Sequence, residues 1–315
     1  MIRKVIFVGG TSFSGSTMMD MTLANDPKGF SCGEVVNLFY PVKSHHLNPW
    51  CGCGEPDCKV WERVRSGGRR NLYGTLSELF PNVSFVVDSS KHPCWIDQQE
   101  KIARAMGLET EHVLIWKSPA GLAKSFAKRG NLAEFESAYV EYHRRFNVRG
   151  RRWTGVQYES ITGNPAVLEA LCARLGIPMF EGKQEFWAKR HHTLFGNNSA
   201  KISLFSDEHP RFQYIREQRV EFEGDNPASV IHHRKIFQEG RQDVPELART
   251  NDIHWERVEQ IAAALRERSI GGADIGAATR TLTELVTAGF FDQHIRCALF
   301  STRRRLARRR LRHAR

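Results

Sequence analysis

The sequence predicts a three-layer α/β fold in which helices flank a central parallel sheet. Short apolar or β-branched runs alternate with segments of helical pattern, as in chains that build parallel sheets. The predicted strands are residues 4–8, 84–87, 112–116 and 154–158, and each is followed by glycine or polar residues. Open α/β sheets bind ligands at the carboxyl ends of their strands, so we expect the functional site at that edge.

Between these runs the pattern predicts helices over residues 16–24, 97–106, 120–128 and 165–175. The last of these ends at Gly176, a residue that commonly stops helices. We expect one domain over residues 1–300, with an insertion at 41–70 that is not a core element. A loop at 269–276 precedes a final helical region, and residues 301–315 form an arginine-rich tail.

Composition and charge restrict the class of protein. The 315 residues are 41% hydrophobic and 26% charged, which is typical of a globular protein. The net charge is +11, but residues 303–315 contain eight arginines, and without them it is +3. That excess suits a small anionic ligand better than a long polyanion, so we expect no nucleic acid.

Targeting signals and cysteine usage point to the cytoplasm. No apolar run approaches the roughly 20 residues that span a bilayer, and residues 1–8 are too short for a secretory signal. Without such a signal, the seven cysteines are interpreted as thiols or metal ligands and not as a disulfide framework. We expect a cytoplasmic protein without a membrane span.

The segment GGTSFSGSTMM, residues 9–19, follows the apolar run at 5–8 and predicts an anion-binding loop. A glycine-rich turn that opens a helix directs backbone N–H groups and the positive end of the helix dipole into one concavity. The glycine spacing matches the nucleotide-triphosphatase loop, but Ser16 stands where that loop needs its lysine. An ATPase is therefore disfavoured, and the loop suits an anion that needs no magnesium.

The segment SGSTMM resembles the 5′-phosphosulfate loop of the sulfotransferases that use 3′-phosphoadenosine 5′-phosphosulfate. The resemblance implies a P-loop-like fold, that co-substrate, and transfer of a sulfuryl group to a hydroxyl or amine, with no metal required. One departure is Phe13, where the family often has Arg or Lys. The residues that would bind the donor's phosphosulfate are Ser12, Phe13, Ser14, Gly15, Ser16 and Thr17.

Other segments resemble further motifs of that family. Lys117 and Ser125 match the pair that holds the 3′-phosphate, with lysine in place of the usual arginine. Lys91, in FVVDSSKHP, corresponds to the lysine at the transferring oxygens and is our candidate for the cation missing at Phe13. For the general base the resemblance offers Glu34, which we favour, and His92.

Two later segments extend the resemblance to residue 201. Tyr158 and Glu159 match a Tyr-Glu stretch that we expect to organise the sheet end. In HHTLFGNNSAK, residues 191–201, the resemblance implies that the donor is contacted by Gly196, Asn197 and Lys201. Nothing beyond about residue 205 matches.

The insertion and the tail leave alternatives open. Cys51, Cys53 and Cys58, with His45 and His46 just upstream, are compatible with a structural zinc site, with reduced thiols or with one disulfide, and no fourth ligand is evident. Near the tail, apolar residues on one helical face are compatible with contact to an anionic membrane or with a solvated terminal run. These residues are Phe291, Ile295, Leu299 and Leu306.

The leading hypothesis is a sulfotransferase whose acceptor is a small molecule or glycolipid with a free hydroxyl. The sequence does not identify that acceptor. The alternatives are a nucleotide or small-molecule kinase on a related fold, and a non-catalytic protein that binds anions or nucleic acid through its tail.

Overall fold

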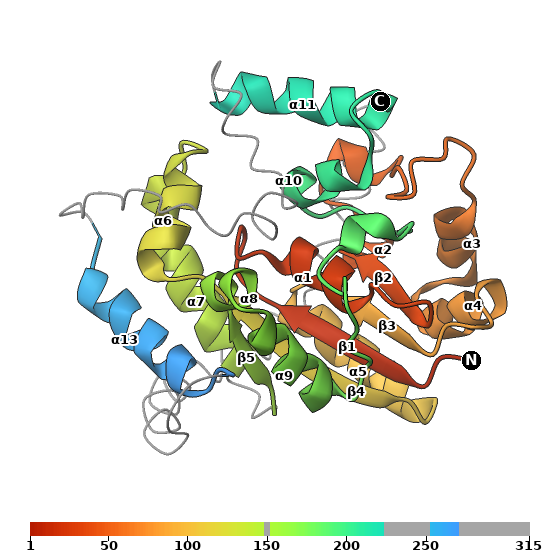
Figure 1. Ribbon diagram of the computed structural model, residues 1–315, viewed down its shortest axis with the longest axis horizontal. Coiled ribbons are helices and arrows are strands. Elements are labelled where there is room, and N and C mark those ends of the chain that lie inside the picture. Colours follow the sequence, from red (N-terminus) through yellow and green to blue (C-terminus); the bar gives the residue numbers. More distant parts are fainter. Residues whose placement is uncertain (148–151, 224–252, 271–315) are drawn as a thin grey trace.

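Five parallel strands form the central sheet of the computed structural model, which describes residues 1–147, 152–223 and 253–270 (Figure 1). The order across the sheet is β2-β3-β1-β4-β5, and each neighbouring pair is parallel. The predicted parallel α/β fold is confirmed. The strands are β1 (Lys4–Gly9), β2 (Gly29–Gly33), β3 (Phe85–Asp88), β4 (Glu109–Trp116) and β5 (Thr154–Gln157).

The three layers follow from the alternation of side chains along β1. Val5 and Phe7 enter one apolar cluster, whereas Ile6 and Val8 enter another on the opposite face. A parallel sheet covered on both faces needs such continuous apolar strands. Helices α1, α8 and α9 pack in the second cluster, and α3 to α7 with α13 pack in the first.

The helices agree well with the sequence pattern. Residues 165–175 are a helix as predicted: the Asn164 side chain caps it by accepting from the Ala166 N–H (3.0 Å), and Gly176 adopts a φ of 60°. The helix expected from residue 97 begins earlier, because Pro93 suits a first helical turn. The helices are α1 (Ser16–Leu23), α2 (Val36–Phe39), α3 (Val60–Gly67), α4 (Leu72–Leu79), α5 (Pro93–Ala105), α6 (Pro119–Ala127), α7 (Phe135–Asn147), α8 (Tyr158–Gly163), α9 (Pro165–Leu175), α10 (Asn198–Lys201), α11 (Pro210–Glu223) and α13 (Trp255–Glu267).

Strand β2, at the edge of the sheet beside β3, is absent from the strands that the residue pattern predicts. Its sequence, GFSCG, has no β-branched residue, so local propensity does not reveal it. Phe30 and Cys32 pack into the first apolar cluster, and the Ser31 hydroxyl donates to Asp20 on α1. Tertiary contacts therefore define this strand.

The segment 41–70 is joined to the core, so the expectation that it is not a core element is wrong. Trp61 and Val64, on α3, are buried in the first apolar cluster. The Trp61 indole N–H also donates to the carbonyl of His192 (2.6 Å). Although the segment is rich in turn-forming residues, burial of its aromatic and aliphatic side chains attaches it to the core.

Several expectations fall outside the described residues. They are the tail at 301–315, the apolar face at 291–306, and all but the first two residues of the loop at 269–276. Within the described ranges, none of the helices has the length and apolar character needed to cross a membrane. Cys94 is disulfide-bonded, which departs from the expectation of thiols and ligands, whereas Cys32, Cys51, Cys53, Cys58 and Cys172 are free thiols.

Candidate functional site

A cavity of about 1050 Å³ opens at the carboxyl ends of the strands, where the sequence places the site. Seven cationic side chains and one carboxylate, that of Glu34, are among the residues that line it. This excess of positive charge favours an anionic ligand. The cations are those of Lys43, Lys91, Lys117, Lys128, Arg129, Lys201 and Arg211.

The loop after β1 forms one wall of the cavity and leads into α1. Gly15 is the N-cap of α1 with a φ of 97°, and a Cβ at this position would lie 2.4 Å from the Cδ2 atom of Tyr158. Glycine is required there for both reasons. Phe13 also has a positive φ (67°), although it carries a side chain. The loop thus brings the first turn of α1 against the cavity.

Five of the six predicted loop residues line the cavity, and Ser14 is the exception. Ser12, Phe13, Gly15, Ser16 and Thr17 line the cavity. The Ser14 side chain is buried and lies against Gly10. Its Oγ is 2.4 Å from the position that a Cβ on Gly10 would take. Ser14 therefore shapes the turn and is not part of the lining.

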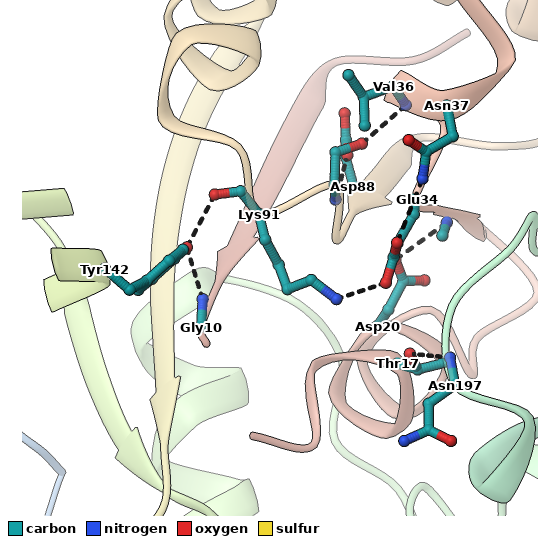
Figure 2. A network of polar contacts seen from close by, with 12 residues as sticks. Gly10, Thr17, Asp20, Glu34, Val36, Asn37, Asp88, Lys91, Tyr142 and Asn197 are labelled. Atoms are coloured by element: carbon teal, nitrogen blue, oxygen red, sulfur yellow. Dashed lines mark hydrogen bonds and ion pairs between the residues drawn. The ribbon is translucent and has the colours of Figure 1, made fainter. Parts of the chain in front are cut away.

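Lys91 and Glu34 form an ion pair in the cavity wall (Figure 2). Both side chains are about one-fifth exposed. The Asn37 side-chain amide donates to the other oxygen of Glu34 (3.3 Å). The pair therefore brings a carboxylate and an ammonium group together at the carboxyl ends of the neighbouring strands β2 and β3.

Tyr142, on α7, connects the loop after β1 with Lys91. Its hydroxyl accepts from the Gly10 N–H (2.7 Å) and donates to the Lys91 carbonyl (2.9 Å) (Figure 2). The φ of Lys91 is 63°, an unfavourable value that this contact helps to hold. Sequence reasoning missed Tyr142 because it lies on a helix that has no motif.

His92, the second candidate base, has a different position. It is the N-cap residue of α5 and is not among the residues that line the cavity. Between the two candidates, the carboxylate of Glu34 is the one that lines the cavity beside Lys91.

Lys117 and Ser125 meet at another part of the cavity, where β4 leads into α6. Their Nζ and Oγ atoms are 3.4 Å apart, and the Lys117 ammonium lies 4.4 Å from the centre of the Tyr158 ring. Glu159 accepts from the backbone N–H (3.3 Å) and hydroxyl (3.0 Å) of Ser118. Tyr158 and Glu159 thus fix this sheet end, as predicted.

Arg129 is a cavity cation that the sequence did not single out. Its guanidinium lies 4.1 Å from the centre of the Phe13 ring, a distance typical of a cation–π contact. A cation is therefore present near the position where the resemblance lacks one. The only signal in the sequence is the pair Lys128-Arg129, which directly follows α6.

The segment 195–201 closes the cavity on the side of α1. The Asn197 N–H donates to the Thr17 hydroxyl (2.9 Å) (Figure 2). A Cβ on Gly196 would lie 2.7 Å from the same oxygen. The Lys201 ammonium lies 3.6 Å from the centre of the Trp50 ring. Burial lowers the pKa of Lys201 to about 7.

Asp20 lies behind the loop, fully buried on α1. It accepts hydrogen bonds from the Ser31 hydroxyl and from the Gly33 N–H (3.1 Å). Burial raises the pKa of this carboxyl to about 7, although these two donors oppose the shift. Asp20 joins α1 to β2 and so links the loop to the strand that precedes Glu34.

Comparisons with known proteins give matches among solved structures. No family model matches the chain, and no curated protein matches it in sequence. A sulfotransferase domain from the Synechococcus PCC 7002 olefin synthase matches with a TM-score of 0.44 and 15% identity, over 78% of this chain and 96% of that one. A sulfotransferase domain from the curacin biosynthetic pathway matches with a TM-score of 0.49 and 16% identity, over 78% and 99%. At this level of similarity the two domains indicate nothing about substrate.

Proposed function

We propose that this chain is a sulfotransferase that uses 3′-phosphoadenosine 5′-phosphosulfate and sulfates a hydroxyl group. The observation that supports this most strongly is the meeting of four elements in one cavity. These are the loop at 12–17, the Lys117–Ser125 pair, Lys91, and Glu34 as the carboxylate of the lining. A polyanionic donor and a neutral nucleophile fit such a set of charges.

In the proposed complex the donor's two anionic ends occupy separate parts of the cavity. The first turn of α1 and the hydroxyls of Ser16 and Thr17 bind the 5′-phosphosulfate. Lys117 and Ser125 bind the 3′-phosphate, since a cation and a hydroxyl 3.4 Å apart can share one phosphate. Gly196, Asn197 and Lys201 close the donor site from the side of α10.

The reaction is an in-line displacement at sulfur. The acceptor oxygen forms a new S–O bond while the S–O bond to the 5′-phosphate breaks, and the phosphate keeps the electron pair. Glu34 takes the proton of the acceptor hydroxyl. Lys91 stabilises the negative charge that develops on the leaving phosphate oxygen. Lys91 also holds the Glu34 carboxylate in the cavity before substrates bind.

The acceptor remains a prediction of class only: a small molecule or glycolipid with a free hydroxyl. The volume of the cavity lies just above the range of about 300–1,000 Å³ that is usual for ligand pockets, so it has room for a donor and an acceptor. A cytoplasmic location, and contact of the basic tail with an anionic membrane, also remain predictions.

The proposal is tested by calorimetric titration with 3′-phosphoadenosine 5′-phosphate, the stable product. We expect micromolar affinity for the wild type, no heat from ATP with magnesium, and at least a tenfold loss of affinity in Lys117→Ala, since a charge-assisted hydrogen bond contributes about 1.5–3 kcal/mol. Lys101→Ala, which removes an exposed lysine of α5 outside the cavity, is the matched control.

Other results of these titrations would favour a different function or overturn the proposed one. Binding of ATP with magnesium in place of the bisphosphate would support a kinase. Loss of bisphosphate binding on deletion of residues 303–315 would support an anion-binding protein that works through its tail. Absence of bisphosphate binding in a folded wild-type chain would overturn the proposed function.

A further inference from the structure

Four side chains outside the cavity gather into one group that offers three sulfurs and one imidazole nitrogen. Cys51, Cys53 and Cys58 come from the loop before α3, and His192 comes from a segment far along the chain. The candidate ligand atoms lie within 4.8 Å of one another. His45 and His46, the histidines close in sequence, line the cavity instead.

The distances fit a tetrahedral zinc ion. With Zn–S bonds of about 2.3 Å and Zn–N bonds of about 2.0–2.1 Å, a tetrahedral site sets its sulfur and nitrogen ligands about 3.6 Å apart and its sulfurs about 3.8 Å apart. The Nδ1 atom of His192 is 3.3 Å from the Cys51 sulfur and 3.5 Å from the Cys58 sulfur. Three cysteines and one histidine are a frequent ligand set of structural zinc.

The backbone around the group is arranged as a tight turn held against the segment of His192. The Gly52 N–H donates to the Thr193 carbonyl (2.8 Å), and the Gly54 N–H donates to the Cys51 carbonyl (3.1 Å). Gly54 has a φ of 82°. A Cβ on Gly52 would lie 2.5 Å from the Thr193 side chain, so the two segments approach as closely as glycine allows.

Packing around His192 fixes the orientation of its ring. The ring stacks on Phe30 with an interplanar angle of 8° and lies 5.2 Å from the centre of the Phe80 ring. The carbonyl of His192 accepts from the Trp61 indole N–H. These contacts come from β2, α3 and the end of α4, and they hold Nδ1 toward the three sulfurs.

We propose that Cys51, Cys53, Cys58 and His192 bind one structural zinc ion. Four protein ligands leave no open position, so the ion joins two chain segments and takes no part in a reaction. The position of the ion also connects it with the cavity. Leu194, two residues after His192, bridges to Cys51 and to Gly33, and its carbonyl accepts from the Glu34 N–H (2.8 Å). The ion therefore supports the strand end that presents Glu34.

The test is a metal analysis of the full-length chain, expressed in zinc-supplemented medium and purified with a phosphine reductant. We expect about one zinc per chain, and a lower thermal midpoint once the metal is withdrawn by a chelator. Cobalt substituted for zinc should give the absorption bands of a tetrahedral cobalt–thiolate site. None of these readouts depends on the proposed sulfotransferase activity.

Variants assign the ligands. Cys53→Ser and His192→Ala should lose stoichiometric zinc, whereas His192→Cys, which replaces one ligand by another, should retain it. Cys172→Ala removes a free cysteine from α9 and should keep wild-type zinc content. A reduced, folded wild-type chain without zinc, a disulfide among Cys51, Cys53 and Cys58, or unchanged zinc affinity in His192→Ala would each overturn the proposal.

Discussion

Lys91 pairs with Glu34 across the carboxyl ends of β3 and β2, although the two residues are 57 positions apart in the sequence. The two strands are parallel neighbours, so the residues that follow them emerge at the same edge of the sheet. One ion pair thus holds both a candidate base and a candidate cation for the leaving group. Their roles are separable by mutation.

Glu34→Gln should lower kcat without weakening the donor site. A positioned general base contributes about 10²–10⁴-fold to a rate, and the amide cannot accept the acceptor's proton. Affinity for 3′-phosphoadenosine 5′-phosphate should stay the same or rise, because a negative charge leaves the cavity. Steady-state kinetics with an acceptor found by turnover screening, together with calorimetry, separates the two effects. The control is Glu109→Gln, which removes an exposed carboxylate that pairs with Lys4. A loss of binding with unchanged kcat would contradict the role of base.

Tyr142→Phe should destabilise the fold by about 1–3 kcal/mol, because it leaves the buried Gly10 N–H without its acceptor. The free energy of unfolding in urea measures this change. Tyr73→Phe is a matched control: Tyr73 is buried, and its hydroxyl has no hydrogen-bond partner among the described residues, so its removal should be neutral or stabilising. Equal effects of the two substitutions would show that the link between Gly10 and Lys91 contributes nothing.

Lys201 should make donor affinity depend on pH near neutrality. Burial lowers its pKa to about 7, an effect that the nearby Glu34 carboxylate opposes, so the free protein loses this charge as the pH rises through that value. An anionic ligand favours the charged form, and the affinity that Lys201 contributes should therefore fall as the pH rises from about 6 to about 8.5.

Calorimetry with 3′-phosphoadenosine 5′-phosphate over that range checks the expectation. The ligand's own phosphate titrates near pH 6, so the comparison is between variants at one pH. The ratio of wild-type affinity to Lys201→Met affinity should decline with pH. Lys101→Met, which changes an exposed lysine, should follow the wild type. A constant ratio would remove Lys201 from the donor site.

The parts of the site that could be predicted from the sequence are those fixed by local pattern and strand order. Apolar runs locate four of the strands, and parallel neighbours bring their ends together. Lys117, at a strand end, and Ser125, on the helix that follows, are only eight positions apart. Their contact is therefore set by local structure. The sequence pattern did not predict strand β2, because burial of its side chains, and not β-propensity, defines it.

Contacts between distant elements could not be predicted in this way. The Arg129 guanidinium over Phe13 depends on how α6 packs beside the first loop. His192 reaches Cys51 from 141 residues away, so the spacing of the cysteines alone could not supply the fourth member of the group. Tyr142 connects two loops from a helix without a motif. In each case the side chain's neighbours are set by tertiary packing.

Gly15→Ala should destabilise the protein by about 1–3 kcal/mol and weaken donor binding. Alanine at this position would have to adopt a φ of 97°, which is unfavourable for a residue with a side chain, and its Cβ would lie 2.4 Å from Tyr158. The loop or the ring must therefore move. Gly163→Ala is the control, since a Cβ at that position meets nothing within 4 Å. Urea unfolding and calorimetry measure the two effects. Unchanged stability in Gly15→Ala would mean that the loop adapts without strain.

Asp20 should make the protein less stable as the pH rises toward neutrality. Burial raises the pKa of its carboxyl to about 7 from the ordinary value of 3.8. Below the lower value both the folded and the unfolded chain hold the proton. Between the two values the folded chain keeps it while the unfolded chain releases it, so the free energy of unfolding falls with rising pH, by at most about 1.4 kcal/mol per pH unit. Above about pH 7 this contribution is constant.

Asp20→Asn removes the titration and keeps an uncharged group of the same shape. Asp88, whose pKa burial raises to about 6, acts in the same direction in both proteins, and its charge also raises the pKa of Asp20, so the difference between their unfolding free energies reports Asp20 together with its coupling to Asp88. Urea unfolding at several values between about pH 4.5 and about pH 7.5 should give a smaller negative slope for Asp20→Asn than for the wild type. Asp207→Asn, an exposed substitution, should run parallel to the wild type. Equal slopes in Asp20→Asn and the wild type would mean that Asp20 is ionised in the folded protein, with Ser31 and Gly33 supplying enough hydrogen bonding to hold the charge.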